Sequence, residues 1–280
     1  MKNCSYLQDL FCLDGQVAIV TGASGTGMGL GRQFAIALAR AGADVVICAR
    51  TMKGLEETER LIHEVADVEV LSVACDVSKA EDIQNVVDAT IEKFGKIDIL
   101  VNNAGIGRVK NFFDYTEEDW KYVMDVNMTS MFLMTQACAK HMKEQHYGRI
   151  INLGSQNAYG ATRCNPIYVT SKGAIRQFTK AVGNDLVGYG INVNSLSPGV
   201  FLSEEDSAAS TQQGQANEDK ASVVINNQPI KRTGKANELD GALIFLASKA
   251  CSYCVGMDIL VDGGITNLIY ENPDLVEQYL

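Results

Sequence analysis

Three residues near the middle of the chain have the types and the spacing needed to move a proton to or from a substrate oxygen. Tyr168 and Lys172 are four positions apart, and Ser155 precedes Tyr168 by thirteen positions. If Pro166 opens a helix, the phenol and the ammonium lie on one helical face. A nearby cation favours the phenolate, so we expect Lys172 to lower the pKa of Tyr168 from its usual value near ~10. Tyr168 could then act as a general acid or base, with Ser155 holding the substrate oxygen. A packed Tyr beside a solvated Lys would show the same spacing, so the motif needs support from the rest of the chain.

A regular alternation of apolar and amphipathic segments surrounds these residues. The strand-like apolar runs span 16–20, 44–49, 69–75, 97–101, 149–153, 191–196 and 257–261. Helical patterns begin near Phe34 and then cover 53–66, 79–94, 117–143, 167–187 and 236–248. Apolar strands that alternate with helices are typical of a parallel sheet covered on both faces. We therefore predict an α/β fold of Rossmann type, with a doubly wound, seven-stranded parallel sheet in a single domain spanning 1–280.

A glycine-rich segment joins the first strand-like run to the first helical pattern. Residues 21–31 contain Gly22, Gly25, Gly27, Gly29 and Gly31. A strand, a glycine-rich turn and a helix bring backbone N–H groups and a helix N-terminus to a pyrophosphate. The Walker A and G-x-G-x-x-G patterns do not fit, because the first requires a Lys at position 28 and the second matches no register. An ordinary glycine-rich turn is the alternative.

The composition excludes several classes of function. The chain has 280 residues, of which 46% are hydrophobic, and its 24 basic and 34 acidic residues give a net charge of −10. This charge argues against nucleic acid or an anionic membrane as a partner. Because no apolar run approaches the ~20 residues of a membrane span and no signal peptide is visible, we expect a cytoplasmic protein. Neither the three His nor Cys251 and Cys254 have convincing metal-ligand spacing, so no metal site is expected.

Further short motifs stand at the ends of the predicted strands and on helix faces. In chain order they are Thr21-Gly22, Asp76, Asn102-Asn103-Ala104-Gly105, Asn127, Ser155, Tyr168-x3-Lys172, Pro198-Gly199 and Asp262-Gly263-Gly264. Each motif alone is weak. In this order, the chain resembles the short-chain dehydrogenase/reductase family, in its smaller single-domain branch, over essentially its whole length. The nearest activities that the resemblance suggests are those of hydroxysteroid dehydrogenases and gluconate 5-dehydrogenases.

The resemblance implies a role for each of four catalytic residues. Tyr168 is the expected general acid and base, and Lys172 is expected to hold the cofactor ribose and to lower the pKa of Tyr168. Ser155 would hydrogen-bond the reacting oxygen. Asn127 would support a proton relay through water, although an Asn that satisfies local backbone groups is the alternative.

The resemblance also implies a set of cofactor-binding residues. They are Gly22, Ser24, Gly27, Leu30, Arg50, Thr51, Asp76, Val77, Asn103, Ala104, Gly105, Tyr168, Lys172, Pro198, Gly199, Val200 and Ser203. The glycine loop is three residues longer than the usual family pattern, and the extra residues fall within 25–28. This departure leaves open which glycine faces the pyrophosphate.

The end of the second predicted strand bears on the choice of nicotinamide cofactor. NAD enzymes place an acid there for the ribose 2′-hydroxyl, whereas an Arg can meet a 2′-phosphate. This chain has Arg50 and Thr51 and no acid. We therefore expect NADP(H), with NAD(H) as the alternative if Arg50 stacks on the adenine.

The substrate is the least specified part of the prediction. Gln156, Asn157 and Tyr159 are expected to contact it, beneath a lid at about 203–228 and near an apolar tail at 265–280. The lid and tail favour a bulky alicyclic alcohol or ketone, such as a hydroxysteroid or bile acid. The alternatives are a polyol or gluconate-type sugar acid, which would suit these polar residues and Arg108, and a 3-oxoacyl thioester.

Two further expectations concern the type of protein and its assembly. A dinucleotide-binding protein without activity is disfavoured, because such a protein would not need all four predicted catalytic residues. Members of the family are usually dimers or tetramers, so we expect a homo-oligomer.

Overall fold

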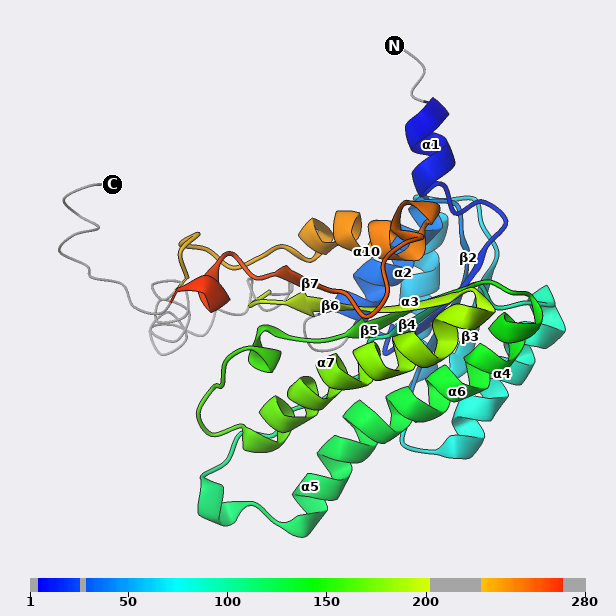
Figure 1. Ribbon diagram of the computed structural model, residues 1–280. Helices are drawn as coiled ribbons and strands as arrows, with labels where there is room; N and C mark the ends of the chain where they lie inside the picture. Colours follow the sequence, from blue (N-terminus) through cyan, green and yellow to red (C-terminus); the bar gives the residue numbers. More distant parts are fainter. Residues whose placement is uncertain (1–4, 26–28, 202–227, 269–280) are drawn as a thin grey trace, which may run out of the picture.

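Seven parallel strands form one sheet at the centre of the molecule (Figure 1). The computed structural model describes residues 5–25, 29–201 and 228–268. The strands are β1 (Val17–Thr21), β2 (Asp44–Ala49), β3 (Val70–Ala74), β4 (Ile99–Asn102), β5 (Gly148–Leu153), β6 (Ile191–Pro198) and β7 (Asp258–Val261), in the order β3-β2-β1-β4-β5-β6-β7. This arrangement confirms the predicted Rossmann-type sheet. Its strand order reverses direction between β1 and β4, which is where such sheets bind ligands at the carboxyl ends of their strands.

Helices cover both faces of the sheet, as Figure 1 shows. Helices α2 (Leu30–Arg40), α3 (Met52–His63) and α10 (Asp240–Ala247) pack on one face, and α4 (Ala80–Phe94), α6 (Ser130–Glu144) and α7 (Pro166–Leu186) pack on the other. Successive strand residues point to opposite faces. In β1, Ala18 and Val20 therefore join the first hydrophobic cluster, whereas Val17 and Ile19 join the second.

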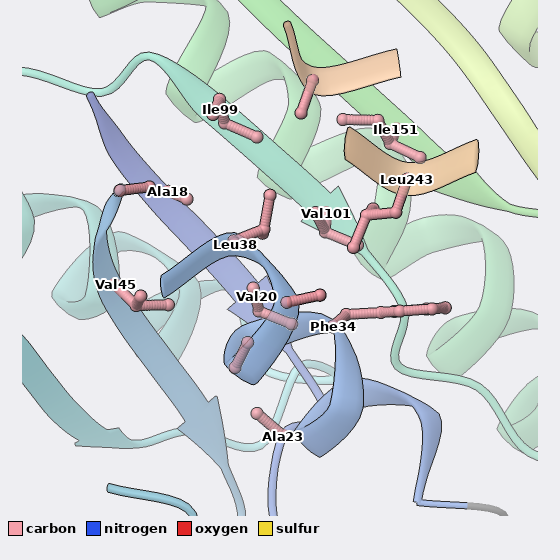
Figure 2. Close-up of a cluster of buried hydrophobic side chains, with 14 of the residues drawn as sticks. Ala18, Val20, Ala23, Phe34, Leu38, Val45, Ile99, Val101, Ile151 and Leu243 are labelled. Carbon is pink, nitrogen blue, oxygen red and sulfur yellow. The ribbon is translucent and has the colours of Figure 1, made fainter. Parts of the chain in front are cut away.

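Helix α2 shows how one of these clusters is built (Figure 2). Its residues Phe34 and Leu38 are four positions apart, so both side chains point from one face of the helix toward Val20 and Val101 of the sheet. All four side chains are buried completely. The N-terminus of α2 is thereby fixed over the carboxyl end of β1, directly after the glycine-rich turn.

A chain of buried amide and hydroxyl groups links the two central strands to the helices of the second face. Asn102 of β4 donates from Nδ2 to Asn152 Oδ1 of β5 (2.9 Å) and to Thr135 Oγ1 of α6 (3.0 Å). Asn152 Nδ2 in turn donates to Thr179 Oγ1 of α7 (3.0 Å). Satisfied buried polar groups of this kind specify one arrangement, because any slip would leave a polar group unpaired. The network therefore holds α7 in register with β5.

The helices differ from the sequence prediction in two places. Helix α1 (Ser5–Phe11) has no counterpart in the prediction. The region predicted as one helix over 117–143 is divided into α5 (Glu117–Met124), a π-helical turn (Asp125–Thr129) and α6. Single π turns inside helices are frequent at functional sites, and this one contains Asn127.

Several sequence expectations concern parts or properties on which the fold bears only in part. Most of the predicted lid at 203–228, and the tail beyond residue 268, lie outside the described residues. Within residues 5–25, 29–201 and 228–268, no helix combines the length and apolar character needed to cross a bilayer. The same residues contain no group of three or more His, Cys, Asp or Glu side chains placed to hold a metal ion.

Candidate active site

A cavity of about 770 Å³ opens at the carboxyl ends of the strands. Residues that follow β1, β2, β3, β4, β5 and β6 line it, together with the first turns of α2 and α7. Most of the predicted site residues share this lining: Gly22, Ser24, Leu30, Arg50, Thr51, Asp76, Val77, Asn103, Ala104, Gly105, Ser155, Tyr168, Lys172, Pro198 and Gly199. The fold therefore brings residues from seven separate stretches of the chain to one cavity.

Helix α7 presents Tyr168 and Lys172 to this cavity. Pro166 occupies its first turn, as predicted, where the missing N–H is not needed. Lys172 is buried, its Nζ donates to the carbonyl oxygen of Leu153 (2.7 Å), and Nζ lies 5.5 Å from the centroid of the Tyr168 ring. Burial disfavours the ammonium and lowers the pKa of Lys172 to about 8.

The pKa of Tyr168 differs from the sequence prediction. We expected Lys172 to lower it, but burial of the phenol raises it above its ordinary value, and only the hydrogen bonding of Ser155 acts in the opposite direction. The prediction is wrong for this structure because desolvation outweighs the neighbouring groups. Tyr168 therefore holds its proton at neutral pH, which is the form that a general acid requires.

Ser155 follows β5 by two residues and begins a short 3-10 turn, Gln156–Ala158. Its Oγ accepts a hydrogen bond from the backbone N–H of Asn157 (3.1 Å). This bond orients the hydroxyl on the wall of the cavity that Tyr168 also lines. Asn157 thus acts on Ser155 through its backbone.

Asn127 lies in the π turn and ties two walls of the site together. Its Oδ1 accepts from the N–H of Ile106 (2.8 Å), and its Nδ2 donates to the Ile106 carbonyl (2.9 Å) and to Ser171 Oγ (2.9 Å). Ser171 Oγ donates to the carbonyl oxygen of Tyr168 (2.7 Å). Asn127 therefore fixes the loop after β4 against the first turns of α7. These bonds match the local backbone role that was the alternative for Asn127.

The glycine-rich turn is closely packed against its neighbours. A Cβ at Gly22, which has a φ of +71°, would lie 2.9 Å from Asn103 Nδ2, and a Cβ at Gly31 would lie 2.3 Å from the Gly22 carbonyl oxygen. Side chains are excluded at both positions, so the backbone of the turn lies directly on the cavity. Gly29 and Gly31 line the cavity, although we did not predict them, and Gly27 lies outside the described residues.

Two polar side chains hold this turn from behind. Arg32 donates to the Ser24 carbonyl oxygen (3.0 Å) and to Thr58 Oγ1 (3.1 Å), and Thr58 donates to the Ala23 carbonyl oxygen (2.7 Å). The sequence gave no sign of this role for Thr58, because it lies on α3, far from the turn along the chain.

The loop after β4 is fixed just as firmly to the end of β1. The backbone N–H groups of Asn103 and Ala104 both donate to Thr21 Oγ1 (3.0 Å each), and Asn103 Nδ2 donates to the Thr21 carbonyl oxygen (2.8 Å). Thr21 is buried. One hydroxyl therefore joins the two strands at the point where the sheet order reverses.

The opposite end of the cavity is charged. Asp76 accepts hydrogen bonds from the hydroxyl (2.7 Å) and the N–H (3.1 Å) of Ser78, which together with the nearby charge of Arg50 hold the pKa of its carboxyl below the ordinary value. Arg50 and Thr51 are exposed and line the same cavity. A helix N-terminus, close-packed glycines and these charged groups fit a dinucleotide.

Five predicted residues are not placed in the cavity wall by the structure. Val200, Gln156, Asn157 and Tyr159 are not among its lining residues, and Ser203 lies outside the described part of the chain. The Tyr159 hydroxyl instead donates to Asp258 Oδ2 (2.7 Å). Its ring lies under the Arg176 guanidinium, 4.3 Å from the ring centroid.

Two other polar side chains line the cavity and were not predicted. Tyr122 lies on α5, and Asn165 directly precedes α7. Asn165 Oδ1 is buried and has no hydrogen-bond partner within the described residues, which is unfavourable by about 1–3 kcal/mol for a buried acceptor. Its position three residues before Tyr168, next to Pro166, was the available signal.

Comparison with known proteins supports one family. The family model described as Enoyl-(Acyl carrier protein) reductase matches residues 25–266. A 2-dehydro-3-deoxy-D-gluconate 5-dehydrogenase from Bacillus subtilis is 37% identical over 261 residues, which cover 92% of this chain and 98% of that protein. The chain belongs to the short-chain dehydrogenase/reductase family. It is therefore an oxidoreductase that acts on CH–OH groups with NAD or NADP.

Solved structures of short-chain dehydrogenases/reductases show the same fold. A gluconate 5-dehydrogenase from Burkholderia cenocepacia, in complex with NADP and tartrate, has a TM-score of 0.83 and 35% identity, covering 94% of this chain and all of that one. An L-sorbose reductase from Gluconobacter frateurii, complexed with NADPH and L-sorbose, has a TM-score of 0.86 and 30% identity, covering 92% of this chain and 99% of that one. These relatives favour the sugar-acid alternative over the hydroxysteroid substrate that we expected first.

Proposed function

We propose that this protein is an NADP(H)-dependent oxidoreductase that interconverts a secondary alcohol and a ketone on a sugar acid of the gluconate type. The observation that carries the proposal is the convergence of Ser155, Tyr168 and Lys172 on one cavity with the features of a dinucleotide site. The relatives named above supply the substrate class, since one acts on a dehydrodeoxygluconate and another on gluconate.

The site residues divide the work of ketone reduction. When bound, the cofactor supplies the hydride. Ser155 and Tyr168 hydrogen-bond the carbonyl oxygen, and the neutral phenol of Tyr168 gives that oxygen its proton as the alcohol forms. The Lys172 ammonium, held by Leu153, supplies the positive charge that stabilises the phenolate left behind. In the reverse reaction, the phenolate takes the proton from the alcohol.

The preference for NADP(H) follows from the rim of the cavity next to β2. Arg50 and Thr51 stand where an acid would select the ribose 2′-hydroxyl, and both line the cavity. A guanidinium and a hydroxyl at this place suit a 2′-phosphate. Two related structures contain NADP or NADPH, which supports the same choice.

A cluster of charge at the other rim supports an acidic substrate. Arg108 and Lys110 both pair with Asp119, at 2.9 and 2.6 Å, so one carboxylate faces two cations and a positive charge is left over. The Arg108 guanidinium lies 4.8 Å from the centroid of the Tyr122 ring, which lines the cavity. A surplus cation one ring away from the cavity attracts a carboxylate in this otherwise acidic protein.

A nicotinamide-absorbance assay tests the proposal. The purified protein is mixed with NADPH or NADH and with 5-keto-D-gluconate, 2-dehydro-3-deoxy-D-gluconate, a 3-oxosteroid or a 3-oxoacyl thioester. We expect turnover with at least one of the sugar acids and a higher kcat/KM with NADPH. Turnover only with the steroid or the thioester would overturn the substrate class. Tight cofactor binding with no turnover on any ketone would favour a binding protein.

A further inference from the structure

Asn165 stands at the start of α7 without the role that an Asn usually has there. An Asn in the N-cap position normally accepts a hydrogen bond from a backbone N–H of the first turn. The Asn165 side chain makes no such bond, and its backbone (φ −145°, ψ 44°) lies outside the extended conformation usual for a cap. Its amide is therefore not held by the helix that it begins.

The amide is instead directed into the cavity beside the catalytic phenol. A Cβ placed on Gly107 would lie 3.2 Å from Asn165 Nδ2, 3.6 Å from Asn165 Oδ1 and 3.5 Å from Cδ2 of the Tyr168 ring. The amide and the ring are thus neighbours on one wall, and all three residues line the cavity. The Asn165 Oδ1 atom is buried and has no partner among the described residues.

The segment before Asn165 is held in an unusual conformation. Cys164 has a φ of +59°, in the left-handed region that side chains other than glycine rarely adopt. Its carbonyl oxygen accepts hydrogen bonds from the Lys110 N–H (3.1 Å) and from the Tyr115 hydroxyl (2.8 Å). These bonds fix the backbone turn that directs the next residue inward, so the direction of Asn165 is set by the fold.

We infer that Asn165 is a specificity-determining residue whose amide oxygen accepts a hydrogen bond from a substrate hydroxyl on the carbon next to the reacting carbonyl. A buried acceptor without a partner favours a ligand that brings a donor and disfavours one that does not. The neighbouring carbon is indicated because the amide lies beside the Tyr168 ring. The inference rests on the proposed function and deepens it, because sugar acids carry such hydroxyls.

The test compares substrates that differ only in that hydroxyl. We expect wild type to use 5-keto-D-gluconate with a higher kcat/KM than its 4-deoxy or 6-deoxy analogue. Asn165→Leu should lower kcat/KM for the hydroxylated substrate by about 10- to 100-fold and change that for the affected deoxy analogue by less than about threefold. Asn165→Asp, which keeps an acceptor in the same shape, should retain the preference, because its added charge acts on both substrates alike. The dissociation constant of NADPH should be unchanged in both variants.

The same-loop variant Thr162→Val serves as the matched control, because Thr162 is exposed and does not line the cavity. An equal loss for hydroxylated and deoxy substrates in Asn165→Leu, or no loss for either, would overturn the inference. If Asn165→Leu does not fold, Asn165→Ala removes the same acceptor and is judged by the same ratio. If wild type reduces another class of ketone but no sugar acid, the proposed function fails. The inference is then decided by the same ratio on hydroxylated and deoxy members of that class.

Discussion

The two ends of the cavity differ in how their polar groups are satisfied. At the end predicted to hold the cofactor, the polar groups of Thr21, Arg32 and Asn103 are bonded to the protein itself. Near the catalytic phenol, Asn165 Oδ1 has no partner within the described residues, and neither has Gln156 Oε1, which is buried just outside the lining. The cofactor end is therefore organised before anything binds. The substrate end leaves polar groups for a ligand to satisfy, and four variants or conditions test this difference.

The largest effect is expected at Tyr168, where the two ends meet. Tyr168→Phe removes the proton donor and keeps the ring, so kcat should fall by about 10³-fold or more while NADPH still binds. Steady-state kinetics and fluorescence titration measure the two quantities. Tyr189→Phe, a change at a half-exposed tyrosine outside the cavity, is the control and should retain activity. Substantial turnover by Tyr168→Phe would remove the phenol from the mechanism.

The next effect concerns the cofactor end alone. Arg50→Ala should lower kcat/KM with NADPH by about 10- to 100-fold and leave that with NADH nearly unchanged, because only the 2′-phosphate loses a charged partner. The neighbouring Lys53→Ala is the matched control, since Lys53 is exposed and does not line the cavity. Equal losses with both cofactors would assign Arg50 to the adenine or to structure.

A stability measurement compares the two ends directly. Thr21→Val deprives the backbone N–H groups of Asn103 and Ala104 of their shared acceptor, so the free energy of unfolding should fall by about 1–3 kcal/mol. Asn165→Leu removes an acceptor that has no partner, and should leave the free energy of unfolding unchanged or raise it by up to about 1 kcal/mol. Urea denaturation followed by circular dichroism gives both values. A loss in Asn165→Leu as large as that in Thr21→Val would contradict the contrast between the two ends.

The smallest effect is a pH dependence of cofactor binding. Burial lowers the pKa of Lys172 to about 8, and an anionic dinucleotide favours the ammonium form. Binding then takes up a proton above pH 8, so the affinity for NADPH should weaken as the pH rises through this value, by at most about tenfold per pH unit. Titrations at constant ionic strength measure this. The trend should be absent in Lys172→Met, and the same trend in both proteins would assign it to another group.

Features set by local sequence were predictable here. Pro166, Tyr168 and Lys172 belong to one helical stretch, so their common face follows from helical spacing. Most of the remaining cavity residues follow a strand, and the carboxyl ends of parallel strands meet at one edge whatever the helices do in detail.

Features set by packing between distant segments were not predictable. The pKa of Tyr168 depends on how deeply the phenol is buried, which no spacing reveals. Tyr159 was predicted to meet the substrate, but Asp258, 99 residues later in the chain, draws its hydroxyl away. The unpartnered oxygen of Asn165 likewise follows from the packing of two loops against α7.

Transfer of a labelled hydride tests the central claim most directly. The enzyme is incubated with NADPH that carries deuterium at both positions of nicotinamide C4, together with 5-keto-D-gluconate, and the product is examined by mass spectrometry and NMR. We predict one deuterium on the carbon that bore the ketone, and none in the product made by Tyr168→Phe beyond trace turnover. A reduced product without deuterium on that carbon, or no reduced sugar acid at all, would contradict the account.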